Sequence, residues 1–247
     1  MSPLLTFLCL CACTVLEDRE SCPCTLRLVP ASDVGRAYIA VEAEGGYGMS
    51  IGFVEFNACV SLEVPKAMLS VCVVTGAEPG PEDSDLWIIE EGEDCPELYM
   101  YRTEIDAQRE TVTDTVRFHK RFCVMDISFS GRESRKFRSV AVRSETAGYG
   151  ALGEPVAGSF CHSPSRLHNG SYRLRLPCQL SSDLYMEAEL FSGKKIVFPL
   201  GLYLEGTGYD WDSEDLEDVQ VHIDTRSSSV KIITSCWQKS LTFDLRI

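Results

Sequence analysis

Cysteine is the residue type in this sequence with the widest choice of chemistry. The 247 residues include twelve cysteines, and Cys9, Cys11 and Cys13 fall within five positions at the end of an apolar run. A thiol can be acylated, oxidised to a disulfide, bound to a metal ion or used as a nucleophile. The neighbours of each cysteine decide which of these chemistries its position favours.

The segment that ends at Cys13 is typical of an export and lipidation signal. Residues 1–16 carry no charge, and their apolar stretch is too short to cross a bilayer. The sequence LCAC (10–13) then gives the order found in the bacterial lipobox, where the last thiol is diacylated and becomes the first residue of the mature chain. We therefore expect residues 1–12 to be a signal peptide and Cys13 to be lipidated. The alternative is an ordinary signal peptide that happens to be rich in cysteine. The lack of basic residues before the apolar stretch favours a translation start further upstream.

Residues 13–23 would connect the lipid to the folded chain. Each buried methylene of a fatty acyl chain such as palmitate contributes ~0.8 kcal/mol to membrane binding, so a multiply acylated Cys13 holds a protein at a bilayer without a membrane-spanning helix. The run EDRE (17–20) is charged. We expect residues 13–23 to form an acylated, polar tether that lifts the folded part off the membrane.

A second pair of cysteines suggests a disulfide. The segment ACVSLEVPKAMLSVCVV (58–74) alternates on both sides of Pro65, which predicts a hairpin that sets Cys59 opposite Cys72. Directly opposed residues can lie at disulfide distance, so a Cys59–Cys72 disulfide is a hypothesis. Pro65 does not suit the turns that two-residue hairpins prefer, so the alternative is a longer loop with two half-buried thiols.

The other chemistry-bearing residues do not form an active-site pattern. No motif of a nucleophile, a zinc protease or a phosphate-binding loop surrounds the four histidines, which are His119, His162, His168 and His222. The acidic run 210–218 could offer carboxylates to Ca²⁺, but it lacks the spacing of a calcium loop, so we prefer a solvated, capped turn. We expect no enzyme activity, no metal site and no cofactor. The net charge of −14 argues against nucleic acid as a partner.

Alternation of apolar and polar residues predicts an all-β chain. Segments such as YIAVEA (38–43), LYMYRT (98–103) and YRLRLP (172–177) have a period of two, which indicates strands with one buried face. The most polar break, SGRESRKFR (130–138), predicts a boundary between two antiparallel β-sandwich domains at 24–131 and 132–247. The last strand should complete the second sandwich, with Phe243 and Leu245 facing its core.

Both ends of the chain resemble one family. The pattern LYLEGTGYDW…DLEDVQVHID…VKI…CW (202–237) is similar to the end of the FimB-like fimbrial subunit lipoproteins of Bacteroidetes, in the fimbrillin superfamily. The stretch CTVLEDRESCPCTLRL (13–28) resembles their mature N-terminus, and VSLEVPKAMLSVCVVTG (60–76) resembles a strand–turn–strand of the superfamily. The resemblance covers nearly the whole chain. The motifs are structural rather than catalytic.

The resemblance implies two tandem transthyretin-like sandwiches in a lipid-anchored protein, exposed on the cell outer membrane at the base of a fimbrium. It implies a fimbrial anchor or accessory subunit whose partners are outer-membrane lipid and fimbrial stalk subunits, with the stalk joined by strand exchange. Strand exchange needs an open sheet edge, and we expect that edge in the N- or C-terminal sandwich, beside its first strand. The alternative is a surface adhesin or glycan-binding lipoprotein on the same fold. That alternative would use exposed aromatic residues, for which the candidates are Tyr47, Trp87, Tyr99, Tyr101 and Tyr149.

Overall fold

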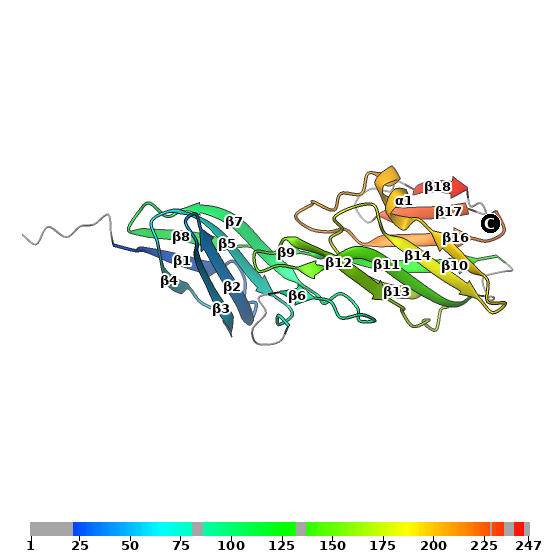
Figure 1. The fold of residues 1–247 in the computed structure, drawn as a ribbon, viewed down its shortest axis with the longest axis horizontal. Helices are drawn as coiled ribbons and strands as arrows, with labels where there is room; N and C mark the ends of the chain where they lie inside the picture. Colours follow the sequence, from blue (N-terminus) through cyan, green and yellow to red (C-terminus); the bar gives the residue numbers. More distant parts are fainter. Residues whose placement is uncertain (1–21, 81–85, 132–136, 228, 235–239, 245–247) are drawn as a thin grey trace, which may run out of the picture.

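The chain forms two β-sandwiches placed end to end along the long axis of the molecule (Figure 1). The computed structural model describes residues 22–80, 86–131, 137–227 and 229–234, and the backbone of 240–244. This part of the chain contains strands and one short helix, so the prediction of an all-β, two-sandwich fold is confirmed. Within the same ranges, no helix is both long enough and apolar enough to cross a membrane.

The N-terminal sandwich packs a three-stranded sheet, in the order β4-β1-β8, against a five-stranded sheet, in the order β3-β2-β5-β7-β9. Its strands are β1 (Cys24–Pro30), β2 (Arg36–Ala43), β3 (Tyr47–Glu55), β4 (Val60–Val64), β5 (Met68–Thr75), β7 (Tyr99–Asp106), β8 (Thr111–Val116) and β9 (His119–Lys120). The alternation seen in the sequence produces the core, because every second residue points inward. In β1 these residues are Cys24, Leu26 and Leu28, all fully buried.

The hairpin predicted at Pro65 is wrong. β4 pairs with β1, whereas β5 pairs with β2 and β7 in the other sheet, so the chain crosses between the sheets at this turn. Cys72 lies opposite Ala40 and is fully buried, whereas Cys59 is exposed just before β4. Both are free thiols, and the Cys59–Cys72 disulfide does not form. An alternating pattern does not distinguish a hairpin within one sheet from a turn that joins two sheets.

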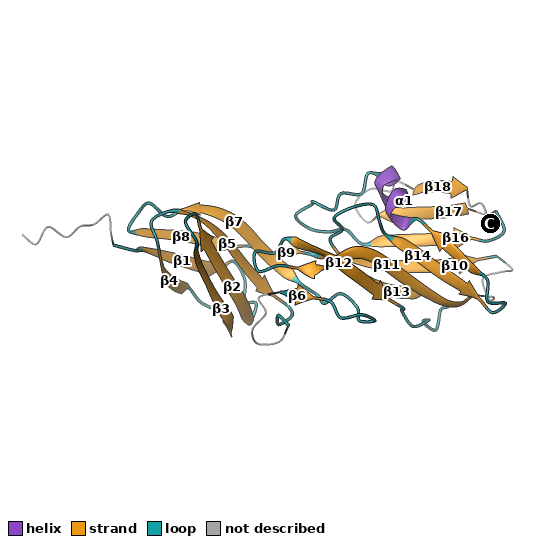
Figure 2. Ribbon diagram, viewed as in Figure 1, coloured by secondary structure: helices purple, strands orange, loops and turns teal. Residues whose placement is uncertain are grey.

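The C-terminal sandwich packs the sheet β13-β10-β16-β17-β18 against the sheet β12-β11-β14-β15. Its elements are β10 (Phe122–Ser130), β11 (Phe137–Tyr149), β12 (Pro155–His162), β13 (Tyr172–Pro177), β14 (Tyr185–Leu190), β15 (Lys195–Phe198), α1 (Leu200–Thr207), β16 (Val219–Asp224), β17 (Ser229–Thr234) and β18 (Ser240–Asp244). Figure 2 shows α1 as a single purple helix beside β17 and β18. Each sandwich contains one parallel pair, β1 with β8 and β10 with β16, so neither is purely antiparallel as predicted.

The predicted boundary between residues 131 and 132 comes too late in the chain. β10 was expected to end the first sandwich, but it is a central strand of the second, between β13 and β16. The boundary therefore precedes Phe122, next to β9. The break at 130–138 lies between two strands of the same sandwich, where polar residues suit a solvated connection as well as a linker.

Two further predictions concern the end of the chain. β18 pairs with β17 through Val230 and Phe243, so the last strand does join the second sandwich. The expected inward direction of Phe243 and Leu245 lies outside what the structure describes of their side chains. The acidic run after α1 forms turns, as expected, in which Asp210 accepts a hydrogen bond from the Asp212 backbone N–H (2.9 Å).

Candidate functional site

The edges of the sheets are the first places to look for binding in a chain without a catalytic constellation. At an edge, backbone N–H and C=O groups lack a neighbouring strand and can pair with another chain. Proteins protect such edges with charged residues, proline, irregular pairing, short strands or a covering segment. The edges of this molecule differ in how much protection they have.

Most edges that the structure describes are protected. β9, β15 and β18 are short, with two, four and five residues. The part of β7 that extends past its pairing with β9 carries three charged residues. β13 carries two arginines, and the shorter strands β4 and β8 carry one carboxylate each. β12 starts at Pro155 and pairs irregularly with β11. These features oppose pairing with a further strand.

β3 is the exception among these edges. It has nine residues, YGMSIGFVE, with a charge at the last position only. Its exposed positions include Gly48, Ser50 and Gly52, which put little side-chain bulk on the outer face. Close to the end of the strand, the Phe53 carbonyl accepts a hydrogen bond from Arg36 Nη2 (2.6 Å). The rest of β3 is uncharged, and it pairs with β2 in unbroken register from Tyr47 to Ile51, before the register shifts between Ile51 and Val54.

The core is also incompletely covered at β3. Ile39 and Val41 of β2 are fully buried, but their partners on β3, Ile51 and Met49, are only partly buried although they pack on the same core. Across the seam between the two sheets, Tyr47 donates a hydrogen bond from its hydroxyl to the Glu63 carbonyl of β4 (3.3 Å). An added strand at β3 would find free backbone groups together with apolar surface still open to solvent.

β1 has the opposite character, because it is held on both sides. It pairs with β4 from Cys24 to Leu28 and with β8 from Thr25 to Pro30. Figure 1 shows that β1 starts at the end of the N-terminal sandwich that points away from the C-terminal sandwich. A pull along β1 from its N-terminal side would load both rows of hydrogen bonds together, because these bonds lie across the strand direction.

A segment of the N-terminal half completes the C-terminal sandwich. Residues 87–98, which we call the strap, connect β5 toward β7, and β6 (Trp87–Ile88) within it pairs with β11. The strap then runs past the edge strands β12 and β13 of the two sheets. The Gly92 N–H donates a hydrogen bond to the Cys161 carbonyl of β12 (2.9 Å), and the Cys95 N–H donates one to the Arg175 carbonyl of β13 (3.4 Å). Ile89 and Cys95 are buried in the core of the C-terminal sandwich.

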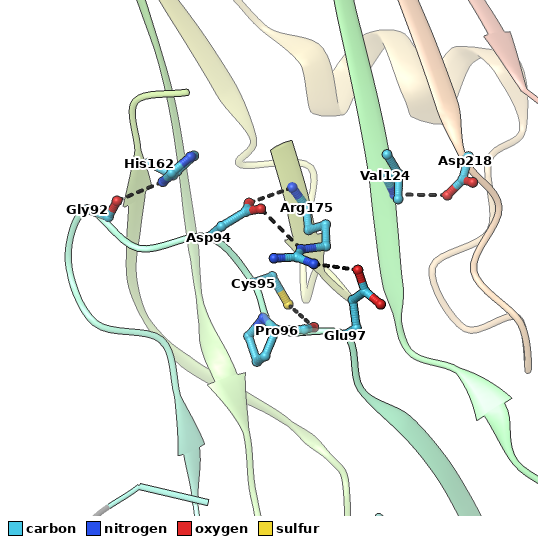
Figure 3. A network of polar contacts seen from close by, with 9 residues as sticks. All are labelled: Gly92, Asp94, Cys95, Pro96, Glu97, Val124, His162, Arg175 and Asp218. Atoms are coloured by element: carbon cyan, nitrogen blue, oxygen red, sulfur yellow. Dashed lines mark hydrogen bonds and ion pairs between the residues drawn. The ribbon is translucent and has the colours of Figure 1, made fainter. Parts of the chain in front are cut away.

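Polar contacts fasten the strap (Figure 3). Asp94 accepts hydrogen bonds from the backbone N–H and Nε of Arg175 (2.6 and 3.1 Å), and Glu97 accepts one from Arg175 Nη1 (2.6 Å). His162 Nδ1 lies 2.7 Å from the Gly92 carbonyl. The strap thus covers two sheet edges and supplies two core residues, so the sandwiches are not independent units.

The junction itself has a small apolar core. Tyr38 meets Trp87 edge to face, with ring centroids 5.0 Å apart, and Trp87 Nε1 donates to the Ala77 carbonyl (3.1 Å). The turn between β11 and β12 docks on the N-terminal sandwich at Gly153, where an added Cβ would lie 2.9 Å from Met100 Sδ and 3.2 Å from Cys72 Sγ. Tyr149 is fully buried, donates to the Arg121 carbonyl and accepts a hydrogen bond from the Cys178 N–H (2.7 Å).

The acidic loop that follows α1 fastens the same junction. Asp215 lies 3.0 Å from His119 Nδ1 and accepts a hydrogen bond from the Lys120 N–H (2.7 Å), and Asp218 pairs with Lys120 Nζ. Burial opposes ionisation of Asp215, but the contacts with His119 and Lys120 outweigh it and lower the pKa of this carboxyl. Across the described residues, no group of three acidic, histidine or cysteine side chains is placed to hold a metal ion. These carboxylates have a structural role.

The residues singled out in the sequence are dispersed. Cys13 lies outside the described residues. Burial raises the pKa of the Cys72 thiol to about 12, which makes it unreactive. Of the aromatic candidates, Trp87 and Tyr149 are buried in the junction, and Tyr101 is tied to Asp114 by a hydrogen bond (2.5 Å). The β3 edge and the strap were not predicted, although the low charge of residues 47–54 was visible in the sequence.

Comparisons with known proteins give a likeness of fold. No family model matches the sequence, and the search of curated proteins finds no match. A candidate polysaccharide-binding protein from Bacteroides thetaiotaomicron is 11% identical, with a TM-score of 0.60 over 88% of this chain and 98% of that one. The fimbrial anchor protein Mfa2 from Porphyromonas gingivalis is 9% identical, with a TM-score of 0.59 over 89% and 100% of the two chains. A candidate adhesin from B. thetaiotaomicron is 14% identical, with a TM-score of 0.57 over 85% and 96%.

Proposed function

We propose that this protein is a cell-surface fimbrial anchor or accessory subunit, which attaches a fimbrial stalk to the outer membrane. The β3 edge carries the proposal. An extended segment of a stalk subunit adds to β3, with backbone hydrogen bonds providing the pairing and alternate apolar side chains covering Met49 and Ile51. At ~3.4 Å per residue, the five residues of β3 from Tyr47 to Ile51, which pair with β2 in unbroken register, offer about 17 Å of edge.

The place of β1 fits attachment through lipid at Cys13. A tether of residues 13–23 leads directly into a strand that is paired on both sides, at one tip of an elongated molecule. Tension from the membrane would enter through β1 and pass through a junction fastened by the strap and the acidic loop. The fold shared with a fimbrial anchor protein is consistent with this role.

Binding at β3 is tested with a substitution that protects the edge. Ser50→Lys places a charge at an exposed position of β3, and Thr113→Lys places the same charge at an exposed position of β8 as a matched control. Peptides corresponding to the termini of the stalk subunit encoded next to this protein are titrated against each variant. We expect Ser50→Lys to weaken binding at least about tenfold, because the charge opposes strand addition, while Thr113→Lys binds like the unmodified protein. Equal binding by both variants would contradict the proposed site.

A further inference from the structure

A hollow of about 350 Å³ lies on the C-terminal sandwich, at the end that faces the junction. It is enclosed by the loop between β13 and β14, by α1 and by the loop that follows α1. Figure 1 shows this last loop reaching from α1 toward β9. The residues that give the hollow its chemistry are Gln179, Leu180, Glu205, Tyr209, Trp211 and Asp212. The loop that follows α1 also contacts the junction between the sandwiches, but the hollow itself has no role in the fold described above.

Its aromatic wall is held in place by the protein. The rings of Tyr209 and Trp211 meet with centroids 4.6 Å apart and planes inclined by 62°. The Tyr209 hydroxyl donates to the Glu217 carbonyl (2.7 Å), and the Trp211 carbonyl lies 3.0 Å from Cys178 Sγ, which donates to it. Because these contacts fix the loop, a ligand would not need to order it, and binding would cost less conformational entropy.

An exposed leucine adds to the apolar surface of the hollow. The Leu180 side chain is 51% exposed, although the Leu180 backbone N–H is held by Thr146 Oγ1 (3.1 Å). This hydrogen bond fixes the backbone that carries the side chain at the rim. Together with the two aromatic rings, Leu180 offers an apolar surface to a ligand.

The polar side chains of the hollow are mostly acceptors of hydrogen bonds, with the carboxylates of Glu205, Asp210 and Asp212 beside the hydroxyls of Ser181 and Ser182. Glu205 and Asp212 are exposed carboxylates, and within the described ranges neither takes part in an ion pair. Gln179 donates through Nε2 to the Pro177 carbonyl (2.7 Å), which leaves its amide oxygen as an acceptor. A fitting ligand therefore has several donors, an apolar face for the aromatic wall, and no negative charge.

We propose that this hollow binds a neutral saccharide, a function separate from strand addition at β3. Sugar hydroxyls would donate to Glu205, Asp212 and the Gln179 amide oxygen, while the C–H face of a ring packs on Tyr209 or Trp211. The volume suits one or two sugar rings. Acidic sugars are excluded by repulsion from the carboxylates. Ca²⁺ takes six to eight oxygen ligands, and among the described residues no group of three acidic, histidine or cysteine side chains is placed to hold a metal ion.

The test is isothermal titration calorimetry of the intact protein with neutral di- and trisaccharides of glucose, galactose and mannose, and with the matching uronic-acid saccharides. Trp211→Ala removes part of the aromatic wall, and Glu205→Gln and Asp212→Asn each remove a charge with little change of shape. Phe191→Ala is the control, because Phe191 is aromatic and 71% exposed but lies outside the hollow. Thermal unfolding is measured for each variant, since Trp211 also packs on the protein core.

We expect at least one neutral saccharide to bind, with the uronic-acid forms weaker. Trp211→Ala should weaken binding about tenfold or more, and the carboxylate variants about three- to tenfold, while Phe191→Ala and the β3 variant Ser50→Lys leave it unchanged. The proposal is overturned if no neutral saccharide binds at millimolar concentration, or if Glu205→Gln and Asp212→Asn bind like the unmodified protein. It is also overturned if a lysine-rich peptide binds the hollow and the saccharides do not. None of these outcomes bears on strand addition.

Discussion

Replacing Tyr149 with phenylalanine should destabilise the junction between the sandwiches. Tyr149 is fully buried. Its hydroxyl donates a hydrogen bond to the carbonyl of Arg121, which follows β9, and accepts one from the backbone N–H of Cys178, which follows β13. Burial raises the pKa of this hydroxyl, so it stays protonated and remains a donor at physiological pH. Phenylalanine fills the same space but leaves one donor and one acceptor without a partner.

The size of the effect follows from these two groups. A buried polar group left without its partner costs about 1–3 kcal/mol, and Arg121 is only partly buried, so we expect Tyr149→Phe to lose about 2–4 kcal/mol of unfolding free energy. For a chain of this length each kcal/mol lowers the melting temperature by about 2–4 °C, which gives a fall of about 5–15 °C. Urea unfolding followed by circular dichroism measures the loss. The control is Tyr185→Phe, whose exposed hydroxyl donates to Asp183 (3.3 Å) and should matter little. A loss below about 0.5 kcal/mol for Tyr149→Phe would refute the reasoning.

Four further predictions follow from the same features. Cys13→Ser should abolish fatty-acid labelling and release the protein from the membrane fraction, whereas Cys11→Ser should have little effect; unchanged labelling of Cys13→Ser would refute lipidation at Cys13. In the folded protein a thiol reagent should modify the exposed Cys59 quickly and the buried Cys72 only after unfolding, as peptide mass spectrometry can measure. A fragment of residues 122–247 should fail to give a cooperative unfolding transition, because it lacks Ile89, Cys95 and the cover of the strap; a cooperative fragment would mean that the strap is dispensable. The lowered pKa of Asp215 means that its folded form binds protons less readily than its unfolded form, so its contribution to stability is present at neutral pH and is lost as the pH falls below about 4. Asp215→Asn should therefore reduce the fall in unfolding free energy that is measured as the pH drops below about 4.

The strands could be predicted from the sequence because one buried face gives a period of two, and β1, β13 and β14 all follow it. The pairing of the strands could not be predicted from the sequence. β4 and β5 are joined by a short turn and alternate as a hairpin would, yet they belong to different sheets. The polar stretch after β10 has the composition of a linker although it connects two strands of one sandwich.

The helix and the strap were missed for different reasons. α1 has the sequence LGLYLEGT, which includes two glycines and no clear apolar stripe, so its helical form depends on packing. Gly201 permits this packing, since an added Cβ would lie 2.0 Å from the Ser182 carbonyl oxygen. The strap contains two residues in a strand and has no period of its own, so its place against β12 and β13 is set by tertiary contacts alone. The low charge of β3 was visible, but its position at a sheet edge was not.

The central claim, that β3 accepts a strand from a fimbrial partner, is tested most directly by hydrogen exchange. The purified protein is mixed with terminal peptides of the stalk subunit, and amide exchange is followed by mass spectrometry along the N-terminal sandwich. Strand addition predicts slower exchange in residues 47–55, no change in β8, and loss of the effect in Ser50→Lys. Peptide binding that protects another edge and leaves 47–55 unchanged would contradict the claim, as would the absence of binding by every terminal peptide.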